Sequence, residues 1–192
     1  AETLQRSGYN LFFNFTVNSE DSLLEPGLPS VGERLEQMGA LCGYAGPEAV
    51  YWRFDPVCHY RVADGEIRNN LGDFLKIADA ASKSGIKVCI TSFLDLYAKV
   101  EKRAAAIDGF SFVNLPDDEK MEILLEMEDE LKKRNIRLYT CCEKSLLEKA
   151  PSYSGLEPSS CIPNRLLSEL YGADLSLRKD SGQRVKYGCG CG

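Results

Sequence analysis

The sequence predicts an α/β fold, a parallel (β/α) repeat that forms a partial or complete TIM-like barrel. Two observations predict it. Four apolar segments have the length and the near-continuous hydrophobicity of strands covered on both faces, and they span residues 11–17, 50–57, 87–93 and 136–141. Helical periodicity follows each of them. Four consecutive strand–helix units favour a parallel sheet with right-handed crossovers.

The helices expected between these strands have recognisable ends. Ser30 and Glu33 form a capping box, and the apolar stripe after it consists of Val31, Leu35, Met38 and Cys42. A second helix is expected from Glu66 to Ser84, with Gly85 following its end. The remaining expectations are a short helix over 97–107, a loop over 109–116, a strong helix over 117–134, a loop over 151–160, a helix that Gly172 stops, and an extended cysteine-containing tail over 173–192.

Composition places the chain among soluble globular proteins. It has 192 residues, of which 44% are hydrophobic and 27% charged, and we expect a single domain over 1–192. The net charge of −6 gives no overall basic surface for nucleic acid or an anionic membrane. No apolar run has the ~18 residues of a membrane span, and no signal core is present, so a cytoplasmic location is the default. Both ends suggest a fragment of a longer protein.

The eight cysteines fall into two groups. Cys42, Cys58 and Cys89 lie in apolar stretches, where a thiol usually acts as a small hydrophobe. The other five crowd the C-terminal third at positions 141, 142, 161, 189 and 191. Without a secretory signal, metal or iron–sulfur ligation is favoured there over disulfides, although no C-x-x-C is present. The candidate ligands Cys141, Cys161, Cys189 and Cys191 suit zinc and an iron–sulfur cluster equally.

Polar residues stand at the carboxyl end of every expected strand. In strand order they are Thr16 and Asn18, Arg53 and Asp55, Ser92 and Asp95, and Cys141 and Glu143. The carboxyl ends of parallel strands share one side of the sheet, where ligands collect. The carboxylates could coordinate a cation or hold hydroxyl or amino groups, and an arginine fork could grip a carboxylate or phosphate. The alternative is that these groups satisfy one another, for instance as a structural Arg53–Asp55 ion pair.

Several segments resemble a known family. They are Leu24–Pro29, Trp52–Pro56, Ser92–Tyr97, Thr140–Glu143 with Cys161–Ile162, and Lys179–Arg184. Together they are similar to the DUF1848 proteins, a bacterial and archaeal family of unknown function. The resemblance implies a relation to radical S-adenosylmethionine proteins of the spore photoproduct lyase type and a complete or partial (β/α) barrel. It also implies a further C-terminal cysteine cluster that holds an iron–sulfur centre, which this sequence does not include.

These observations leave three functions open. The first is an iron–sulfur enzyme, with S-adenosylmethionine implied by analogy only and a small-molecule substrate held by Arg53, Asp55, Ser92, Asp95 and Glu143. The second is a binding module that holds a small ligand at the same residues without redox chemistry. The third is a structural zinc domain. A nucleic-acid substrate follows only from analogy with the lyases, and the lone histidine, His59, excludes a His-rich metal site within these residues.

Overall fold

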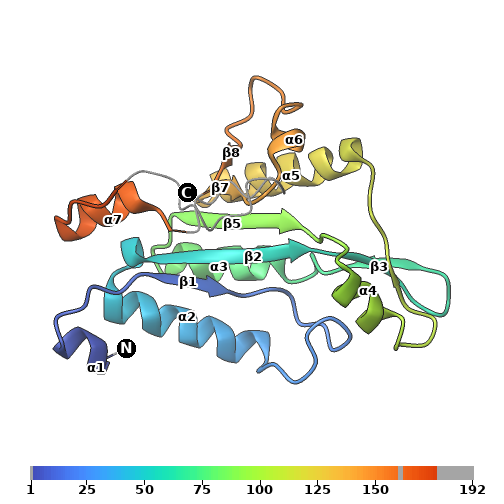
Figure 1. Cartoon of the computed structure of the whole chain (residues 1–192), viewed down its shortest axis with the longest axis horizontal. Helices are drawn as coiled ribbons and strands as arrows, with labels where there is room; N and C mark the ends of the chain where they lie inside the picture. The colour runs from blue at the N-terminus through green and yellow to red at the C-terminus, as the bar shows by residue number, and fades with distance from the viewer. Residues whose placement is uncertain (1, 160–161, 177–192) are drawn as a thin grey trace.

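The computed structural model describes residues 2–159 and 162–176. Its larger sheet is five-stranded and parallel throughout (Figure 1), in the order β1-β2-β5-β7-β8. The strands are β1 (Phe13–Thr16), β2 (Val50–Val57), β5 (Val88–Phe93), β7 (Arg137–Thr140) and β8 (Glu157–Pro158). Spatial order follows chain order, which confirms the parallel repeat. Within the described ranges neither sheet closes on itself, so a TIM-like barrel is not seen.

Three helices cover one face of this sheet. They are α2 (Val31–Ala45), α3 (Phe74–Lys83) and α5 (Asp117–Lys132), and their buried side chains form a single core with those of the strands. The capping box at the start of α2 is present as expected. The shorter helices are α1 (Glu2–Arg6), η1 (Pro47–Ala49), α4 (Ala98–Ala104), α6 (Lys144–Leu147) and α7 (Asn164–Tyr171).

Strand β2 lies at the centre of the core. Trp52 and Phe54 are fully buried on the helix side, and their rings lie 5.6 and 5.2 Å from the ring of Phe74 on α3. The indole N–H donates to the carbonyl of Val17 at 3.0 Å, so the buried ring leaves no polar atom unsatisfied. Because side chains alternate along a strand, the residues between these two point to the opposite face of the sheet.

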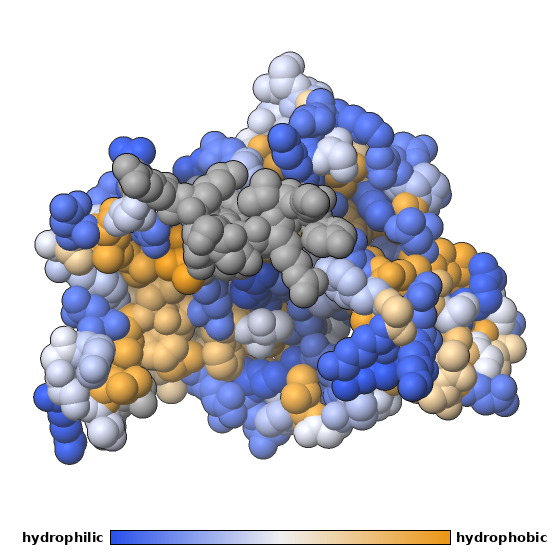
Figure 2. Space-filling view, viewed as in Figure 1, coloured by the Kyte–Doolittle hydropathy of each residue, from blue (hydrophilic) through white to orange (hydrophobic). Residues whose placement is uncertain are grey.

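We call this opposite face the second face. Its side chains change from apolar to polar along the strands. The register aligns Thr16 with Arg53, Arg53 with Ile90, and Ile90 with Tyr139, which makes one row across four strands. Two residues further along these strands stand Asp55, Ser92 and Cys141, where the paired register of β2 and β5 becomes irregular after Phe54. Figure 2 shows apolar side chains over the beginnings of β1 and β2 and hydrophilic ones further along. The polar groups are thus concentrated toward the carboxyl edge.

A small antiparallel sheet was not expected. It consists of β3 (His59–Arg61), β4 (Ile67–Asn69) and β6 (Ser111–Phe112), in the order β4-β3-β6. The expectation of a helix from Glu66 was therefore wrong for its first eight residues, and α3 begins only at Phe74. Ile67 fits a helical stripe, but its side chain is 51% exposed in a hairpin strand. The loop expected over 109–116 likewise contains a strand, and so does the one over 151–160.

Glu128 is the one charged residue in the apolar stripe of α5, and it is buried. Its carboxylate accepts a hydrogen bond from the backbone N–H of Gly155 at 2.6 Å and pairs with Lys132 at 2.9 Å. A Cβ on Gly155 would lie 2.8 Å from the carboxylate oxygen, so a larger residue there would displace the end of the Glu128 side chain. Glu128 therefore interrupts the apolar stripe in order to bind the segment before β8 to α5.

Candidate functional site

Three expected site residues meet at the carboxyl edge of the second face. The Asp55 carboxylate accepts hydrogen bonds from the Arg53 guanidinium, through Nε at 3.1 Å and through Nη2, and from the Ser92 hydroxyl. We call Arg53, Asp55 and Ser92 the edge cluster. The Arg53 and Asp55 side chains are 15% and 18% exposed, so the pair is neither sealed in the core nor fully in water. The ion pair considered from the sequence is present, and it lies where a ligand could reach it.

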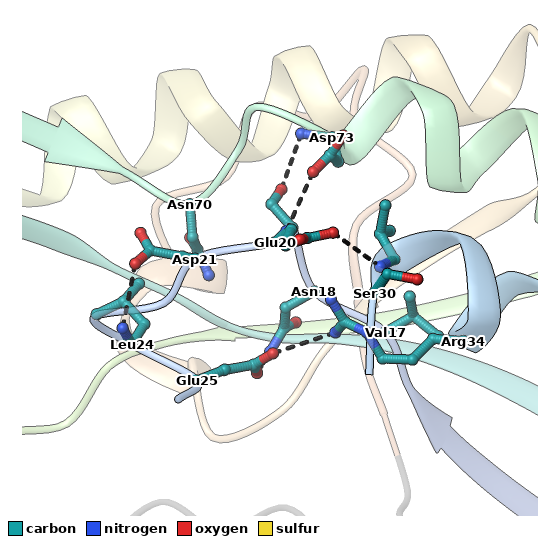
Figure 3. A network of polar contacts seen from close by, with 12 residues as sticks. Val17, Asn18, Glu20, Asp21, Leu24, Glu25, Ser30, Arg34, Asn70 and Asp73 are labelled. Carbon is teal, nitrogen blue, oxygen red and sulfur yellow. Dashed lines mark hydrogen bonds and ion pairs between the residues drawn. The ribbon is translucent and has the colours of Figure 1, made fainter. Parts of the chain in front are cut away.

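Asn18, in the loop after β1, holds the edge cluster in place. Its side-chain oxygen accepts from the Asp55 N–H at 2.9 Å, and its amide donates to the Asp55 carbonyl at 3.2 Å. The same amide donates to Glu25 at 2.7 Å. Glu25 in turn pairs at 3.1 Å with Arg34 of α2, whose side chain is 7% exposed. Figure 3 shows the part of this chain of contacts that includes Asn18, Glu25 and Arg34 and joins the loop after β1 to α2.

Sequence reasoning missed Glu25 and Arg34 as parts of this framework. A signal was available, because Arg34 stands three residues after Val31 and four before Met38, both buried on the same side of α2. A charge at a stripe position must have a buried partner. The acidic loop between β1 and α2 supplies this buried partner, Glu25.

Two adjacent thiols follow β7. Cys141 is buried on the second face beside Ile90, whereas Cys142 is exposed and adopts a positive φ of 66°. Their sulfur atoms lie 3.6 Å apart. The Cys141 N–H donates to the carbonyl of Thr91 at 2.8 Å, which places this thiol next to Ser92 along the edge.

Two further expected residues, Glu143 and Asp95, form hydrogen bonds outside the edge cluster. Glu143 accepts from the backbone N–H of Phe93 at 2.8 Å. Asp95 is exposed and accepts from the Tyr97 hydroxyl at 3.2 Å. Cys161, Cys189 and Cys191 lie outside the described residues. Among the residues described, no group of three or more His, Cys, Asp or Glu side chains is placed to hold a metal ion.

Burial raises the pKa of the Glu143 carboxyl. The Phe93 N–H and Lys120 oppose this shift, and the charges of Asp95 and Asp117 add to it. A carboxyl with a raised pKa in the folded state loses stabilising free energy as pH rises, because the unfolded chain ionises first. The loss begins near the ordinary glutamate pKa of about 4.3 and is complete above the raised pKa.

We therefore expect Glu143→Gln to gain stability relative to wild type as pH rises. The amide oxygen of glutamine still accepts from Phe93, so the variant removes the charge and keeps the hydrogen bond. Urea unfolding between about pH 4 and pH 8 measures the difference, which should grow with pH and then level off. Glu122→Gln, at an exposed position of α5, is the control. A difference that is constant across this range contradicts the assignment.

No helix in the described ranges is both long and apolar enough to cross a membrane. The fold and the edge cluster define an α/β protein with polar side chains gathered at the carboxyl edge of a parallel sheet. The family model "Domain of unknown function (DUF1848)" matches residues 1–192, so the chain belongs to this family. No curated protein and no solved structure gives a significant match.

Proposed function

We propose that the domain belongs to an iron–sulfur enzyme that binds a small polar substrate at the carboxyl edge of the sheet. One observation carries the proposal: Cys141 lies on the same face as Asp55 and Ser92, and its backbone N–H bonds to the carbonyl of Thr91, the residue before Ser92. A thiol ligand and a polar recognition cluster are thus side by side at the edge where α/β enzymes place their chemistry. The chain-ordered parallel strands support a partial barrel of the radical S-adenosylmethionine kind.

The two thiols suit ligation of a single metal ion. At a metal–sulfur distance of about 2.3 Å, two thiolates on one tetrahedral ion lie roughly 3.8 Å apart. The sulfur atoms of Cys141 and Cys142 are 3.6 Å apart, so both could bind one zinc ion or one iron of a two-iron cluster with little movement. Further ligands would come from Cys161, Cys189 and Cys191. An iron–sulfur centre would supply electron transfer, and the edge cluster would orient the substrate.

The test is metal and sulfide analysis with a visible spectrum of anaerobically purified protein. We expect iron, sulfide and broad visible absorbance in wild type. Cys141→Ser should lose most of all three. Cys42→Ser is the matched control, since Cys42 is also buried but lies on α2 on the helix side. Zinc without colour would favour the structural alternative. Protein that contains no metal after anaerobic purification would contradict the proposal.

A second candidate is non-redox binding of a small anionic or polar ligand. The partial exposure of Arg53 and Asp55 favours it, since a guanidinium at a solvent-accessible edge can bind a carboxylate or phosphate. Thermal unfolding with inorganic phosphate and with succinate tests it, because a ligand at a hundred times its Kd stabilises by about 2.7 kcal/mol. Arg53→Met should abolish the stabilisation. Arg61→Met, at an exposed arginine of β3, and Cys141→Ser should not.

A further inference from the structure

A cavity of about 380 Å³ lies beyond the carboxyl ends of β1, β2 and β5. The loop after β1 forms one wall, and α4 with the small antiparallel sheet forms the other. Two residues beside the edge cluster line its inner end. Pro56 follows Asp55 in the chain, and Asn18 accepts a hydrogen bond from the Asp55 backbone. Its volume is within the range of small-molecule sites, roughly 300–1,000 Å³. The inference drawn from it does not depend on the proposed metal centre.

The body of the cavity is apolar. Its apolar lining comes from the loop after β1, from α4 with the turn after it, and from β6 with the residue before that strand. The side chains are Leu23, Leu24, Val100, Ile107, Phe110 and Phe112. Phe110 stacks on Tyr60 of β3 at 5.4 Å between ring centroids, which stiffens this wall. A cavity lined in this way has little affinity for water and favours an apolar occupant.

The polar groups at its inner end are already satisfied by the protein. The Asn70 side chain accepts from the Cys58 N–H and donates to the Pro56 carbonyl, each at 2.9 Å. Glu25 is bound by Asn18 and Arg34, as Figure 3 shows. Burial, followed by nearby carboxylates, raises the pKa of the Cys58 thiol to about 12, so this thiol is neutral at physiological pH and offers soft apolar surface.

Among the described residues that line the cavity, one is a cation. Arg103 of α4 lines the cavity and is exposed, and within the described ranges its guanidinium makes no ion pair or hydrogen bond. It stands one turn after Val100 and one turn before Ile107, so the three share one face of the helical segment. The adjacent Lys102 does not line the cavity. Glu25, the acidic residue among the described residues that line the cavity, is already paired with Arg34 and so does not compete for Arg103.

We propose that this cavity binds a small apolar molecule with a single anionic group. The apolar body occupies the space between the loop after β1 and α4. The anionic group lies at the rim, where it pairs with Arg103. The ligand is thus an aromatic or aliphatic acid rather than a polyanion, because Arg103 is the one cation that the described part of the chain places in the lining.

Two fluorescent probes of matched shape test the proposal on the full chain. Anilinonaphthalene sulfonate has an apolar body with one anionic group, and phenylnaphthylamine has the same body without the charge. We expect saturable binding of one sulfonate probe per chain, tighter than that of the neutral probe. Arg103→Glu should weaken the sulfonate probe about five- to tenfold, the effect of a partly screened ion pair, and leave the neutral probe unchanged.

Three further variants separate the cavity from general surface effects. Lys102→Glu makes the same charge change on the same helix outside the cavity, and it should alter sulfonate binding less than about twofold. Val100→Trp and Ile107→Trp fill the space and should weaken both probes. Ile107 is 37% exposed, so its variant tests the cavity even if Val100→Trp does not fold. Unchanged binding in the filled variants, or equal effects at residues 102 and 103, would overturn the proposal.

Discussion

Replacing Trp52 with alanine should lower the free energy of unfolding by about 3–5 kcal/mol, the cost typical of removing a large aromatic side chain from a core. The indole is fully buried, stacks on Phe74, and satisfies the carbonyl of Val17. The substitution therefore opens a cavity and leaves a buried acceptor without its donor. Urea unfolding at neutral pH measures the change.

Two companion variants divide this loss into its parts. Trp52→Phe keeps much of the ring packing but removes the N–H, so it should cost about 1–3 kcal/mol, the penalty of an unsatisfied buried carbonyl. Tyr153→Ala removes an aromatic ring that is 78% exposed, and it should change stability by less than about 0.5 kcal/mol. If Trp52→Ala were as mild as Tyr153→Ala, β2 would not be the centre of the core.

Removing either partner of the ion pair between Glu25 and Arg34 should lower the free energy of unfolding, and by different amounts. Arg34→Met leaves the Glu25 carboxylate without its cation and should cost about 2–3 kcal/mol, less than the 3–5 of a fully buried pair because that carboxylate is 23% exposed. Glu25→Gln leaves the more deeply buried charge unpaired and should cost more. Denaturant unfolding of each variant gives the comparison.

The double variant Arg34→Met with Glu25→Gln completes the cycle. It removes both charges, and the glutamine oxygen can still accept from Asn18, so we expect a loss of about 1 kcal/mol or less. Strict additivity of the two single losses would show that the residues do not interact in solution. The same cycle reports on the edge cluster, since Asn18 bonds both Glu25 and the backbone of Asp55.

The parallel sheet was predictable because the apolar runs of its strands are nearly continuous. The capping box of α2 was predictable because Ser30 and Glu33 bond locally, without help from the rest of the chain. The hairpin of the small sheet was missed although Asp64-Gly65 is a recognised turn signal. Gly65 has a φ of 84° there. Helical spacing of Ile67 and Leu71 outweighed that signal, and pairing with β3 decided the outcome.

For the candidate site, the convergence of polar residues was predictable and their partners were not. Strand ends alone place Arg53, Asp55 and Ser92 at one edge, and the structure brings these three into hydrogen-bond contact. Asp95 lies only two residues beyond β5, yet its side chain turns to Tyr97. Such choices depend on loop conformation, which periodicity does not encode. That Cys161, Cys189 and Cys191 join Cys141 in a metal site stays a prediction.

The construction of α4 has a consequence for how molecules would enter and leave the cavity. Of its seven residues only Ala104 is buried, whereas β2 buries four side chains in the main core. A segment with so few buried contacts opens locally at a small fraction of the free energy of global unfolding. Amide hydrogens of α4 should therefore exchange with solvent long before those of β2. The rates at which a ligand enters and leaves the cavity would be set by the opening of this helix. That opening has a timescale separate from the folding of the sheet.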